Sequence, residues 1–235
     1  MNFRRFYQAN EVYGTRLDER MRELLRLVVE LAPKRVADVG CGRGLFPAAL
    51  RRHLGAGAEV HGIDVFDDVD PDGWSYTGGD ITRGLPWPDG SFECVLLGEV
   101  IEHVPDPDAL LAEIHRVLVP GGTFIVTTPN LVCWANRLLV PLGVQPFFTE
   151  TSSQVVLGRY LRVLGQGNPV MGHLKVFTHR SLAELLDRCG FEVVRRRGLP
   201  WTALPPPVLL LDRALSRLVP LASILLYVAV RPERA

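Results

Sequence analysis

Apolar residues along this chain recur with two different spacings, one typical of helices and one typical of strands. Over residues 16–31 they recur every three or four positions, which predicts an amphipathic helix that Pro33 ends. Short apolar runs at 35–39 and 60–64 predict strands, with a helix between them that begins near Gly44. Strands that alternate with helices in this way are typical of an α/β fold.

The same alternation continues through the middle of the chain. Further strands are predicted at 74–77, 92–97 and 123–129. A helix over 107–118 is predicted between the last two, because Asp106 is a good N-cap residue. The sequence Pro120-Gly121-Gly122 is a strong turn signal, which we expect to end this helix.

Residues 130–172 break the alternation. This segment mixes aromatic residues, prolines and glycines, and it is too long for a plain connection in a compact domain. We expect an insertion that lies over a site. Its aromatic residues either enclose an apolar ligand or pack the insertion against the core, and they are Trp134, Phe147, Phe148 and Tyr160. Beyond the insertion the pattern predicts a helix, a strand, a helix and a strand at 178–190, 191–198, 208–218 and 224–230, with the two strands paired antiparallel.

The length and net charge of the chain are consistent with a single domain that does not bind nucleic acid. A chain of 235 residues fits a single α/β domain, and 26 basic against 26 acidic residues give a net charge of zero. Most nucleic-acid binders carry a basic surface, so nucleic acid is disfavoured as a partner. The cysteines form no CxxC pair, and we expect them to be reduced, buried thiols.

The chain has no pattern typical of export or of membrane insertion. Residues 1–14 lack the apolar stretch of a secretory signal, and no segment offers about 20 consecutive apolar residues. The most apolar region, 204–230, is interrupted by Asp212 and Pro220, which favours a core helix followed by a strand. We therefore expect a cytoplasmic protein without a transmembrane segment, and leave open whether 204–230 touches a membrane or an apolar ligand.

The segment VADVGCGRG is the first candidate for chemistry. It places Gly40, Gly42 and Gly44 directly after an apolar strand and before a helix, where residues without a Cβ let the backbone turn sharply and approach a ligand. Asp64 closes the next strand, at the spacing where an acidic side chain meets a ribose diol. A dinucleotide site usually has a third glycine where this chain has Leu45, so the loop favours a nucleotide-like ligand without a pyrophosphate.

The segment GGDI after the third strand adds a second candidate. Asp80 can accept a hydrogen bond from an adenine amino group while Ile81 packs on the ring. An aspartate that only stabilises a turn would give the same sequence pattern. Both interpretations of Asp80, as an adenine contact and as a turn residue, therefore remain open.

Several segments together resemble the class I S-adenosylmethionine-dependent methyltransferases. They are VADVGCGRG, the strand end at Asp64, GGDI, the stretch SFECVLLGEVIEHVPDPDALLAEIHRVLVPGGTFIVTTPN and the stretch GHLKVFTHRSLAELLDRCGFEVV. The match covers roughly residues 30–195 and is similar to the group that contains the ubiquinone-biosynthesis O-methyltransferases. It implies a Rossmann-like three-layer sandwich with a seven-stranded, mostly parallel sheet whose last strand is antiparallel, and S-adenosylmethionine as the cofactor.

The resemblance also implies which residues hold that cofactor. In the family, the glycine loop cradles the methionine moiety, the next strand end binds the ribose hydroxyls, and the following loop holds adenine. The matching positions are Asp38, Gly40, Cys41, Gly42 and Gly44 for the methionine moiety, Asp64 with Val65 beside it for the ribose, Asp80 and Ile81 for adenine, and Leu97 and Gly98 for the methyl-donor side.

Methyl transfer from a sulfonium is an in-line displacement, so the protein mainly has to hold the acceptor near the methyl carbon and exclude water. A hydroxyl acceptor also benefits from a base or a Lewis acid. The candidates follow the fourth strand, where Glu99 and His103 are four residues apart and Glu102 adjoins His103, so one helical turn can bring them together. His103 and Glu99 are the candidates for catalysis.

The same residues with the later His173 resemble the metal site of small-RNA 2′-O-methyltransferases, in which Mg²⁺ or a similar ion organises the acceptor hydroxyls. Carboxylate and imidazole ligands together suit several divalent ions. The candidate ligands are Glu99, Glu102, His103 and His173. Glu-His pairs at this place also occur in metal-free relatives, so the sequence does not favour a metal over a base or a purely structural role for His103.

These inferences predict one methyltransferase domain over 1–235, with an acceptor-side lid at about 130–172. We expect it to methylate a small-molecule acceptor, on a hydroxyl oxygen, in a biosynthetic or secondary-metabolite pathway, as a monomer or a homodimer. One alternative is a metal-assisted RNA 2′-O-methyltransferase, which the neutral charge disfavours. The other is a non-catalytic cofactor-binding partner subunit, which the intact glycines disfavour. The run 195–197 of arginines either attracts an anionic acceptor or solvates a strand edge.

Overall fold

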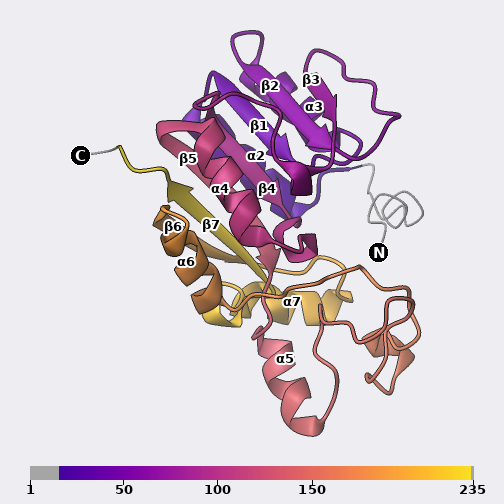
Figure 1. The fold of residues 1–235 in the computed structure, drawn as a ribbon. Coiled ribbons are helices and arrows are strands. Elements are labelled where there is room, and N and C mark those ends of the chain that lie inside the picture. Colours follow the sequence, from indigo (N-terminus) through magenta and orange to yellow (C-terminus); the bar gives the residue numbers. More distant parts are fainter. Residues whose placement is uncertain (1–15, 234–235) are drawn as a thin grey trace.

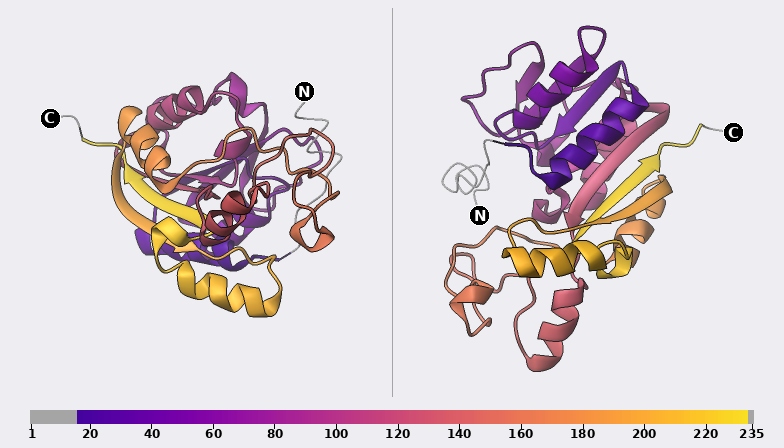
Figure 2. Two further views of the ribbon diagram at one scale, coloured as in Figure 1. Left: turned by 90° about the horizontal axis from the view of Figure 1, so that it is seen from below. Right: turned by 180° about the vertical axis from the view of Figure 1, so that it is seen from behind.

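A seven-stranded sheet with helices on both faces forms the protein in the computed structural model, which describes residues 16–233 (Figures 1 and 2). In their order across the sheet, the strands are β3 (Ser75–Gly78), β2 (Glu59–Asp64), β1 (Arg35–Val39), β4 (Phe92–Gly98), β5 (Leu118–Pro129), β7 (Ile224–Val230) and β6 (Glu192–Leu199). β7 runs antiparallel to both of its neighbours, and the other neighbouring strands are parallel. The predicted sandwich with an antiparallel last strand is confirmed. The expectation drawn from residues 1–14 lies outside the described residues.

The helices follow the amphipathic stretches of the sequence. They are α2 (Glu19–Leu31), α3 (Leu45–Leu54), α4 (Pro107–Val117), α5 (Trp134–Leu139), α6 (His179–Arg188) and α7 (Pro206–Leu215). The Asp18 carboxylate caps α2 by accepting from the Met21 N–H at 2.7 Å. Asp106 caps α4 in the same way, accepting from the Ala109 N–H at 3.0 Å, as the sequence predicted. Short 3₁₀ turns are η1 (Ile81–Arg83), η2 (Ile101–His103), η3 (Val140–Leu142), η4 (Arg162–Leu164) and η5 (Val219–Leu221).

Alternate residues of the central strands supply two hydrophobic cores, one on each face of the sheet. In β1, Val36 packs with residues of α2 and α3, whereas Ala37 packs with residues of α4 and α6. Because helices bury both faces, the parallel strands read as nearly continuous apolar runs in the sequence. This is why they could be recognised there.

The strand β5 is longer than the sequence predicted. It begins at Leu118, which pairs with Phe92, and pairing resumes in a shifted register at Cys94 and Thr123. α4 ends at Val117, so the chain enters the strand directly from the helix. The Pro-Gly-Gly sequence is therefore an irregularity within the strand, and the prediction that it forms the turn that ends the helix was wrong.

The predicted insertion, 130–172, follows β5 and lies beyond the carboxyl ends of the parallel strands (Figure 1). It contains α5, η3 and η4, and the rest of it consists mainly of turns and bends. Its position at this edge of the sheet places it where ligands bind in open α/β sheets.

The apolar region 204–230 folds as α7 followed by β7, as the sequence predicted. Among residues 16–233, no helix is long and apolar enough to cross a membrane. The cysteines are free thiols, and three of them are buried, namely Cys41, Cys94 and Cys133.

Candidate active site

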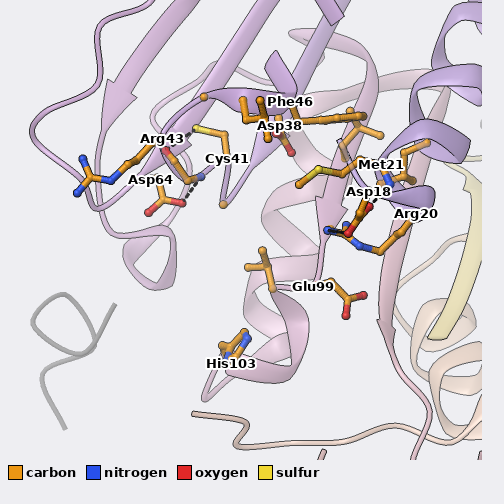
Figure 3. A pocket seen from close by; sticks show the side chains of 18 of the residues that line it. Asp18, Arg20, Met21, Asp38, Cys41, Arg43, Phe46, Asp64, Glu99 and His103 are labelled. Atoms are coloured by element: carbon orange, nitrogen blue, oxygen red, sulfur yellow. Dashed lines mark hydrogen bonds and ion pairs between the residues drawn. The ribbon is translucent and has the colours of Figure 1, made fainter. Parts of the chain in front are cut away.

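A cavity of about 830 Å³ lies at the carboxyl ends of the parallel strands (Figure 3). Its wall is built from α2, the loop after β1, the ends of β2 and β4, the end of the insertion, and the connection between β6 and α7. Segments that are far apart in the sequence thus meet around one volume. The sheet order reverses direction between β1 and β4, and this is the position where open α/β sheets leave a crevice for ligands.

The loop after β1 brings bare backbone to the cavity. Gly40, Gly42 and Gly44 all have positive φ values, of 78°, 57° and 86°. A Cβ on Gly40 would come within 2.4 Å of the Val100 side chain, and one on Gly44 within 2.3 Å of the Trp74 ring. The loop therefore requires glycine both for its conformation and for space.

Asp64, at the end of β2, is fixed in the wall next to this loop. One oxygen of its carboxylate accepts from the Gly42 N–H at 2.7 Å, and the other accepts from the Val65 N–H at 2.6 Å. Burial raises the pKa of Asp64, and these two N–H groups oppose the rise. The carboxylate is therefore held in one orientation at the junction of the loop and the strand.

Asp38 and Arg20 lie near each other on the same side of the cavity. Burial, and next the neighbouring Asp64, raise the pKa of Asp38 to about 7, and the Arg20 guanidinium opposes the rise. Arg20 comes from α2, with one nitrogen 3.8 Å from an Asp18 oxygen and another 3.5 Å from the Thr127 hydroxyl. Arg20 could not be recognised as a site residue from the sequence, because an arginine on the polar side of an amphipathic helix is usually exposed to solvent.

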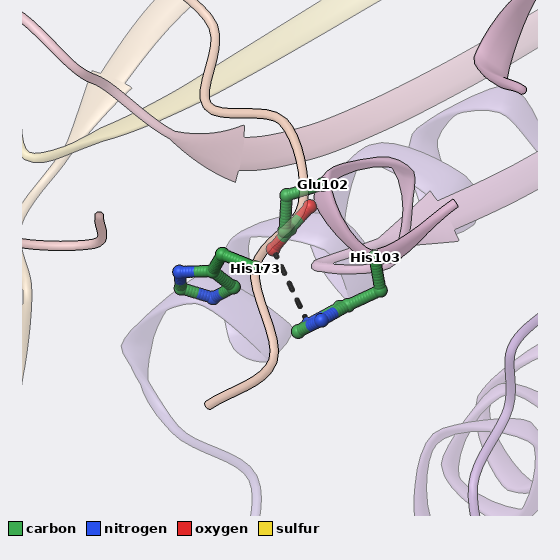
Figure 4. A group of neighbouring side chains, drawn as sticks. All are labelled: Glu102, His103 and His173. Carbon is green, nitrogen blue, oxygen red and sulfur yellow. Dashed lines mark ion pairs between the residues drawn. The ribbon is translucent and has the colours of Figure 1, made fainter. Parts of the chain in front are cut away.

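Three side chains converge at another part of the cavity wall, Glu102 and His103 from η2 and His173, the residue that follows the insertion (Figure 4). Each offers one ligand atom, and these atoms all lie within 4.8 Å of one another. The His103 Nε2 is 3.9 Å from a Glu102 oxygen, and the two imidazole centroids are 4.8 Å apart. The structure therefore brings together three of the four residues that the sequence offered as candidate ligands.

Backbone carbonyls orient both imidazole rings. The Nδ1 of His103 lies 3.1 Å from the Gly172 oxygen, and the Nδ1 of His173 lies 2.8 Å from the Phe148 oxygen. A carbonyl only accepts, so each neutral ring carries its proton on Nδ1. Burial, and next the neighbouring His173, lower the pKa of His103 to about 4, so this ring is neutral at physiological pH.

Glu102 is fully buried and only half satisfied. One carboxyl oxygen accepts from the Thr128 hydroxyl at 2.9 Å, while the other has no hydrogen-bond partner within 16–233. Burial, and next the nearby Glu99, hold the pKa of Glu102 well above its usual range. A buried carboxyl oxygen without a donor is costly, and its presence beside a cavity indicates a site that a ligand or a proton completes.

Glu99 takes a different position from the one expected. Its backbone has a φ of 58°, in the left-handed region that residues other than glycine rarely adopt, and its N–H donates to the Thr127 oxygen at 3.0 Å. Its carboxyl group lies in the cavity wall near Arg20, whose charge opposes the rise in pKa that burial causes (Figure 3). The structure does not bring Glu99 into the group of Glu102, His103 and His173.

The residues expected to hold the cofactor nearly all line the cavity. Those that do are Asp38, Gly40, Cys41, Gly42, Gly44, Asp64, Val65, Asp80, Ile81 and Gly98. Leu97 is the exception, because alternate residues of β4 point to opposite faces of the sheet and its side chain is fully buried in the core on the far face from Leu96. The cavity wall contains Leu96 instead. Asp80 also caps η1 by accepting from the Thr82 N–H at 3.0 Å, so the turn interpretation holds as well.

None of the four aromatic residues expected to enclose a ligand lines the cavity. Phe147 and Phe148 pack against Trp201, the Trp134 indole N–H donates to Asp212, and Tyr160 is exposed. For the first three, packing of the insertion is the interpretation that the structure supports. The aromatic residues that do line the cavity are Phe46, Trp74 and Trp201, and none of them was among the candidates from the sequence. The only signal for Trp201 in the sequence was its place shortly after the predicted strand at 191–198.

The arginine run lies on β6, which is an edge strand. Arg197 forms an ion pair with Glu23 of α2, and the Arg196 guanidinium lies over the Tyr227 ring, 5.6 Å from its centroid. Neither residue lines the cavity. The solvated strand edge is therefore the interpretation that the structure supports.

Comparisons with known proteins agree with this geometry. A family described as a methyltransferase domain matches residues 13–196. A protein of Mycolicibacterium smegmatis named as an S-adenosylmethionine-dependent methyltransferase is 34% identical over 179 residues, which cover 72% of this chain and 65% of that relative. A ubiquinone biosynthesis O-methyltransferase of Xanthomonas oryzae is 35% identical over 125 residues, 48% of this chain and 50% of that relative. The chain thus spans between half and two thirds of these relatives.

Among solved structures, a Burkholderia thailandensis 1,6-didemethyltoxoflavin N1-methyltransferase has a similar fold. The TM-score is 0.54 at 20% identity, with 91% of this chain and 79% of that one covered. That structure contains its acceptor and S-adenosylhomocysteine. At this level of identity the similarity shows the fold alone.

Proposed function

Because the chain belongs to the class I S-adenosylmethionine-dependent methyltransferases, we propose that it transfers the methyl group of S-adenosylmethionine to a hydroxyl oxygen of a small-molecule acceptor. The observation that carries this proposal is a single cavity that joins the glycine loop to the Glu102, His103 and His173 group. One end suits a nucleoside with an amino-acid tail, and the other offers polar groups to a hydroxyl. The pathway that we propose is biosynthetic.

The wall near the glycine loop fits the cofactor by shape and by charge. The backbone of Gly40, Gly42 and Gly44 lines the cavity, and we propose that the methionine moiety lies along it, where Asp38 and Arg20 offer opposite charges for its amino and carboxylate groups. Each carboxylate oxygen of Asp64 accepts one backbone N–H and has a second lone pair. We propose that these remaining lone pairs accept hydrogen bonds from the ribose hydroxyls. Asp80 and Ile81 then face the adenine, as an acceptor and an apolar surface.

When bound, S-adenosylmethionine supplies a methyl group on a positively charged sulfur, and the acceptor oxygen forms its bond to carbon as the carbon–sulfur bond breaks and its electrons pass to sulfur. The acceptor proton must leave at the same time. We propose that the neutral His103 takes this proton on its Nε2, because its Nδ1 already carries a proton that faces the Gly172 oxygen, and that the Glu102 carboxyl, 3.9 Å from Nε2, stabilises the protonated ring. Glu99 acts beside Arg20, whose charge favours the ionised form of the Glu99 carboxyl.

The insertion supplies the cover for this end of the cavity. Val170, Met171 and His173 line the wall from the end of 130–172 and from the residue next to it. We propose that this segment is an acceptor-side lid within one methyltransferase domain. Its function is to exclude water from the transfer.

A divalent metal ion is a second candidate for the same place. Glu102, His103 and His173 offer one carboxylate and two imidazole ligands within 4.8 Å of one another, a donor set that suits several divalent ions. A bound ion would satisfy the Glu102 oxygen that has no hydrogen-bond partner within 16–233 and would lower the pKa of an acceptor hydroxyl. Glu99 lies outside this group, so three of the four candidate ligands from the sequence remain.

Calorimetric titration with S-adenosylhomocysteine tests the cofactor site first. Saturable binding followed by transfer of a labelled methyl group to a hydroxyl acceptor is the expected result. Repeating both measurements after chelation, and then with Mg²⁺ or Mn²⁺ added, separates the two candidates for the acceptor end. Transfer that survives chelation supports His103 as the base, and transfer that requires the ion supports the metal. Transfer to nitrogen or carbon acceptors alone would contradict the proposal.

A further inference from the structure

An aromatic wall lies beside the acceptor end of the cavity. Trp201, in the connection between β6 and α7, lines the cavity, and behind it are the rings of Phe147 and Phe148, with centroids 5.5 and 5.0 Å from its own. The Phe148 ring is in turn 6.4 Å from the His173 ring, which is 4.8 Å from that of His103. The Trp201 side chain is therefore part of the same surroundings as the groups proposed to face the acceptor hydroxyl.

A buried carboxylate fixes the backbone of Trp201. Asp212 of α7 is 0% exposed and accepts from the Trp201 N–H at 2.7 Å through one oxygen. Its other oxygen accepts from the Trp134 indole N–H at 2.7 Å and from the Ser223 hydroxyl at 2.6 Å. Asp212 thus links four parts of the fold: α7, the wall residue Trp201, the insertion through α5, and the residue just before β7.

Hydrophobic burial does not explain this arrangement. α7 buries only Asp212, whereas its neighbours Leu210 and Leu211 are 65% and 47% exposed. Removing a carboxylate from water is costly unless donors replace the water, and here three donors do so. The contacts of Asp212, together with the ion pair between Arg213 and Glu19 of α2, therefore position α7, and Asp212 links α7 to Trp201.

We propose that Trp201 selects acceptors that carry a flat unsaturated ring, and that Asp212 is the positioning residue that holds Trp201 in place. This inference rests on the proposed function, since it requires an acceptor at that end of the cavity. The indole face presents a large rigid surface on which a planar ring can stack, and a saturated ring of the same size cannot stack in this way. The selectivity that such stacking provides is about fivefold to tenfold in affinity.

Two small vicinal diols, one with an aromatic ring and one with a saturated ring, test the selectivity. Their hydroxyl groups also differ in acidity, so the Trp201 variants identify the part of the difference that stacking provides. Catechol and cis-1,2-cyclohexanediol are titrated calorimetrically into the protein saturated with S-adenosylhomocysteine. We expect catechol to bind about fivefold to tenfold more tightly. Trp201→Leu, which keeps apolar bulk but removes the indole, abolishes this difference, and Trp201→Phe retains most of it. Affinity for S-adenosylhomocysteine stays unchanged in both variants and reports that each is folded.

Asp212→Ala and Ser223→Ala test the positioning. Asp212→Ala removes the acceptor for the Trp201 N–H and is expected to abolish the catechol preference, whereas Ser223→Ala removes one donor and leaves that bond in place. If Asp212→Ala fails to fold, Trp201→Leu still decides the proposal. Equal affinity for the two diols, no binding of catechol, or an unchanged preference in Trp201→Leu would overturn the inference. Loss of S-adenosylhomocysteine binding by the unmodified protein would instead contradict the proposed function.

Discussion

The acids and imidazoles of the cavity respond to burial in opposite directions. Burial raises the pKa of Asp38 to about 7 and lowers that of His103 to about 4, because in each case it disfavours the charged form. Both groups are therefore neutral over a wider range than their exposed counterparts. Groups with displaced pKa values that share one cavity are typical of functional sites.

Substitution of Asp64 tests the proposed ribose contact. Asp64→Ala removes an anionic acceptor proposed to bind the ribose, and we expect affinity for S-adenosylhomocysteine to fall by about tenfold to a hundredfold. Calorimetry measures this effect. Asp187→Ala, which alters an exposed acid of α6 outside the cavity wall, serves as the control and should leave the affinity unchanged. Equal affinity in Asp64→Ala and the control would remove the ribose assignment.

Asp38 should make cofactor binding dependent on pH. Its pKa of about 7 means that the ionised form, which attracts an ammonium group, predominates only above that pH. Affinity for S-adenosylhomocysteine is therefore expected to increase as the pH rises through about 7, and Asp38→Asn should remove the dependence. The same raised pKa makes the free energy of unfolding decrease as the pH rises from 3.8 to about 7, since the native state binds the extra proton. A calorimetric series that shows constant affinity in the unmodified protein would contradict this prediction.

His103 should matter for transfer and not for cofactor binding. We expect His103→Ala to lower kcat by about a hundredfold, as loss of a proton-transfer group does, with S-adenosylhomocysteine affinity unchanged. Labelled-methyl transfer to the acceptor found in the screen measures kcat. His53→Ala is the matched control, because His53 lies exposed on α3 and outside the cavity wall. If the His103→Ala variant kept its full kcat, the His103 imidazole would have only a structural role.

The residues that could be predicted from sequence are those whose spacing encodes their role. The glycine loop, Asp64 and the Glu102 and His103 pair each lie at or shortly after the end of a recognisable strand, and strand ends meet at one edge of a parallel sheet. Arg20 and Trp201 could not be found in this way. They reach the cavity only because α2 and the connection after β6 fold back against it, and such long-range contacts leave no local pattern.

At the scale of elements, boundaries were less predictable than element types. α7 begins at Pro206, where the sequence pattern placed the start at 208, because prolines are well tolerated in the first turn of a helix. β5 begins at Leu118, before the turn expected at 120–122, because pairing with Phe92 outweighs the local turn signal. In both cases a contact or conformation outside the local hydrophobic pattern decided the boundary.

The loop between β1 and α3 offers a test of local geometry. Gly44 and Gly143 share left-handed backbones, with φ values of 86° and 70°, but a Cβ would meet the Trp74 ring at Gly44 and nothing within 4 Å at Gly143. Both alanine variants should lose about 1 kcal/mol through backbone strain. Gly44→Ala should lose about a further 1 to 3 kcal/mol through overpacking and bind S-adenosylhomocysteine weakly.

Chemical denaturation measures the free energies of unfolding, and calorimetry measures the binding. Equal losses of stability in the two glycine variants, with binding intact in Gly44→Ala, would mean that the loop moves away from Trp74 at little cost.

At the scale of the whole molecule, the cavity joins segments from one end of the described chain to the other. Arg16 and Ile224 both line it, so a ligand bound there contacts segments that unfolding would separate. Ligand binding to the native state alone adds about 2.7 kcal/mol to the free energy of unfolding at a hundredfold excess over Kd. Ligand binding should therefore stabilise the whole molecule against unfolding in a single cooperative transition.

Thermal denaturation measures this gain. We expect S-adenosylhomocysteine at that excess to raise Tm by about 5 to 10 °C in a single transition. Asp64→Ala, at the same ligand concentration, should show a smaller rise. Two separate transitions, with only one shifted by the ligand, would show that the molecule unfolds in independent parts and would contradict the proposed single domain.

The position of β7 has a consequence for synthesis on the ribosome. β7 is last among the described strands in the sequence, yet it lies between β5 and β6. Until its residues leave the exit tunnel, β5 has an open edge and β6 has no partner, while β1 to β4 can already pair. The strands around the glycine loop can thus pair early in synthesis, whereas β6, which precedes Trp201, pairs only after β7 has been made. A product truncated before Ile224 would expose two unpaired edges, so aggregation should be the characteristic fate of incomplete chains.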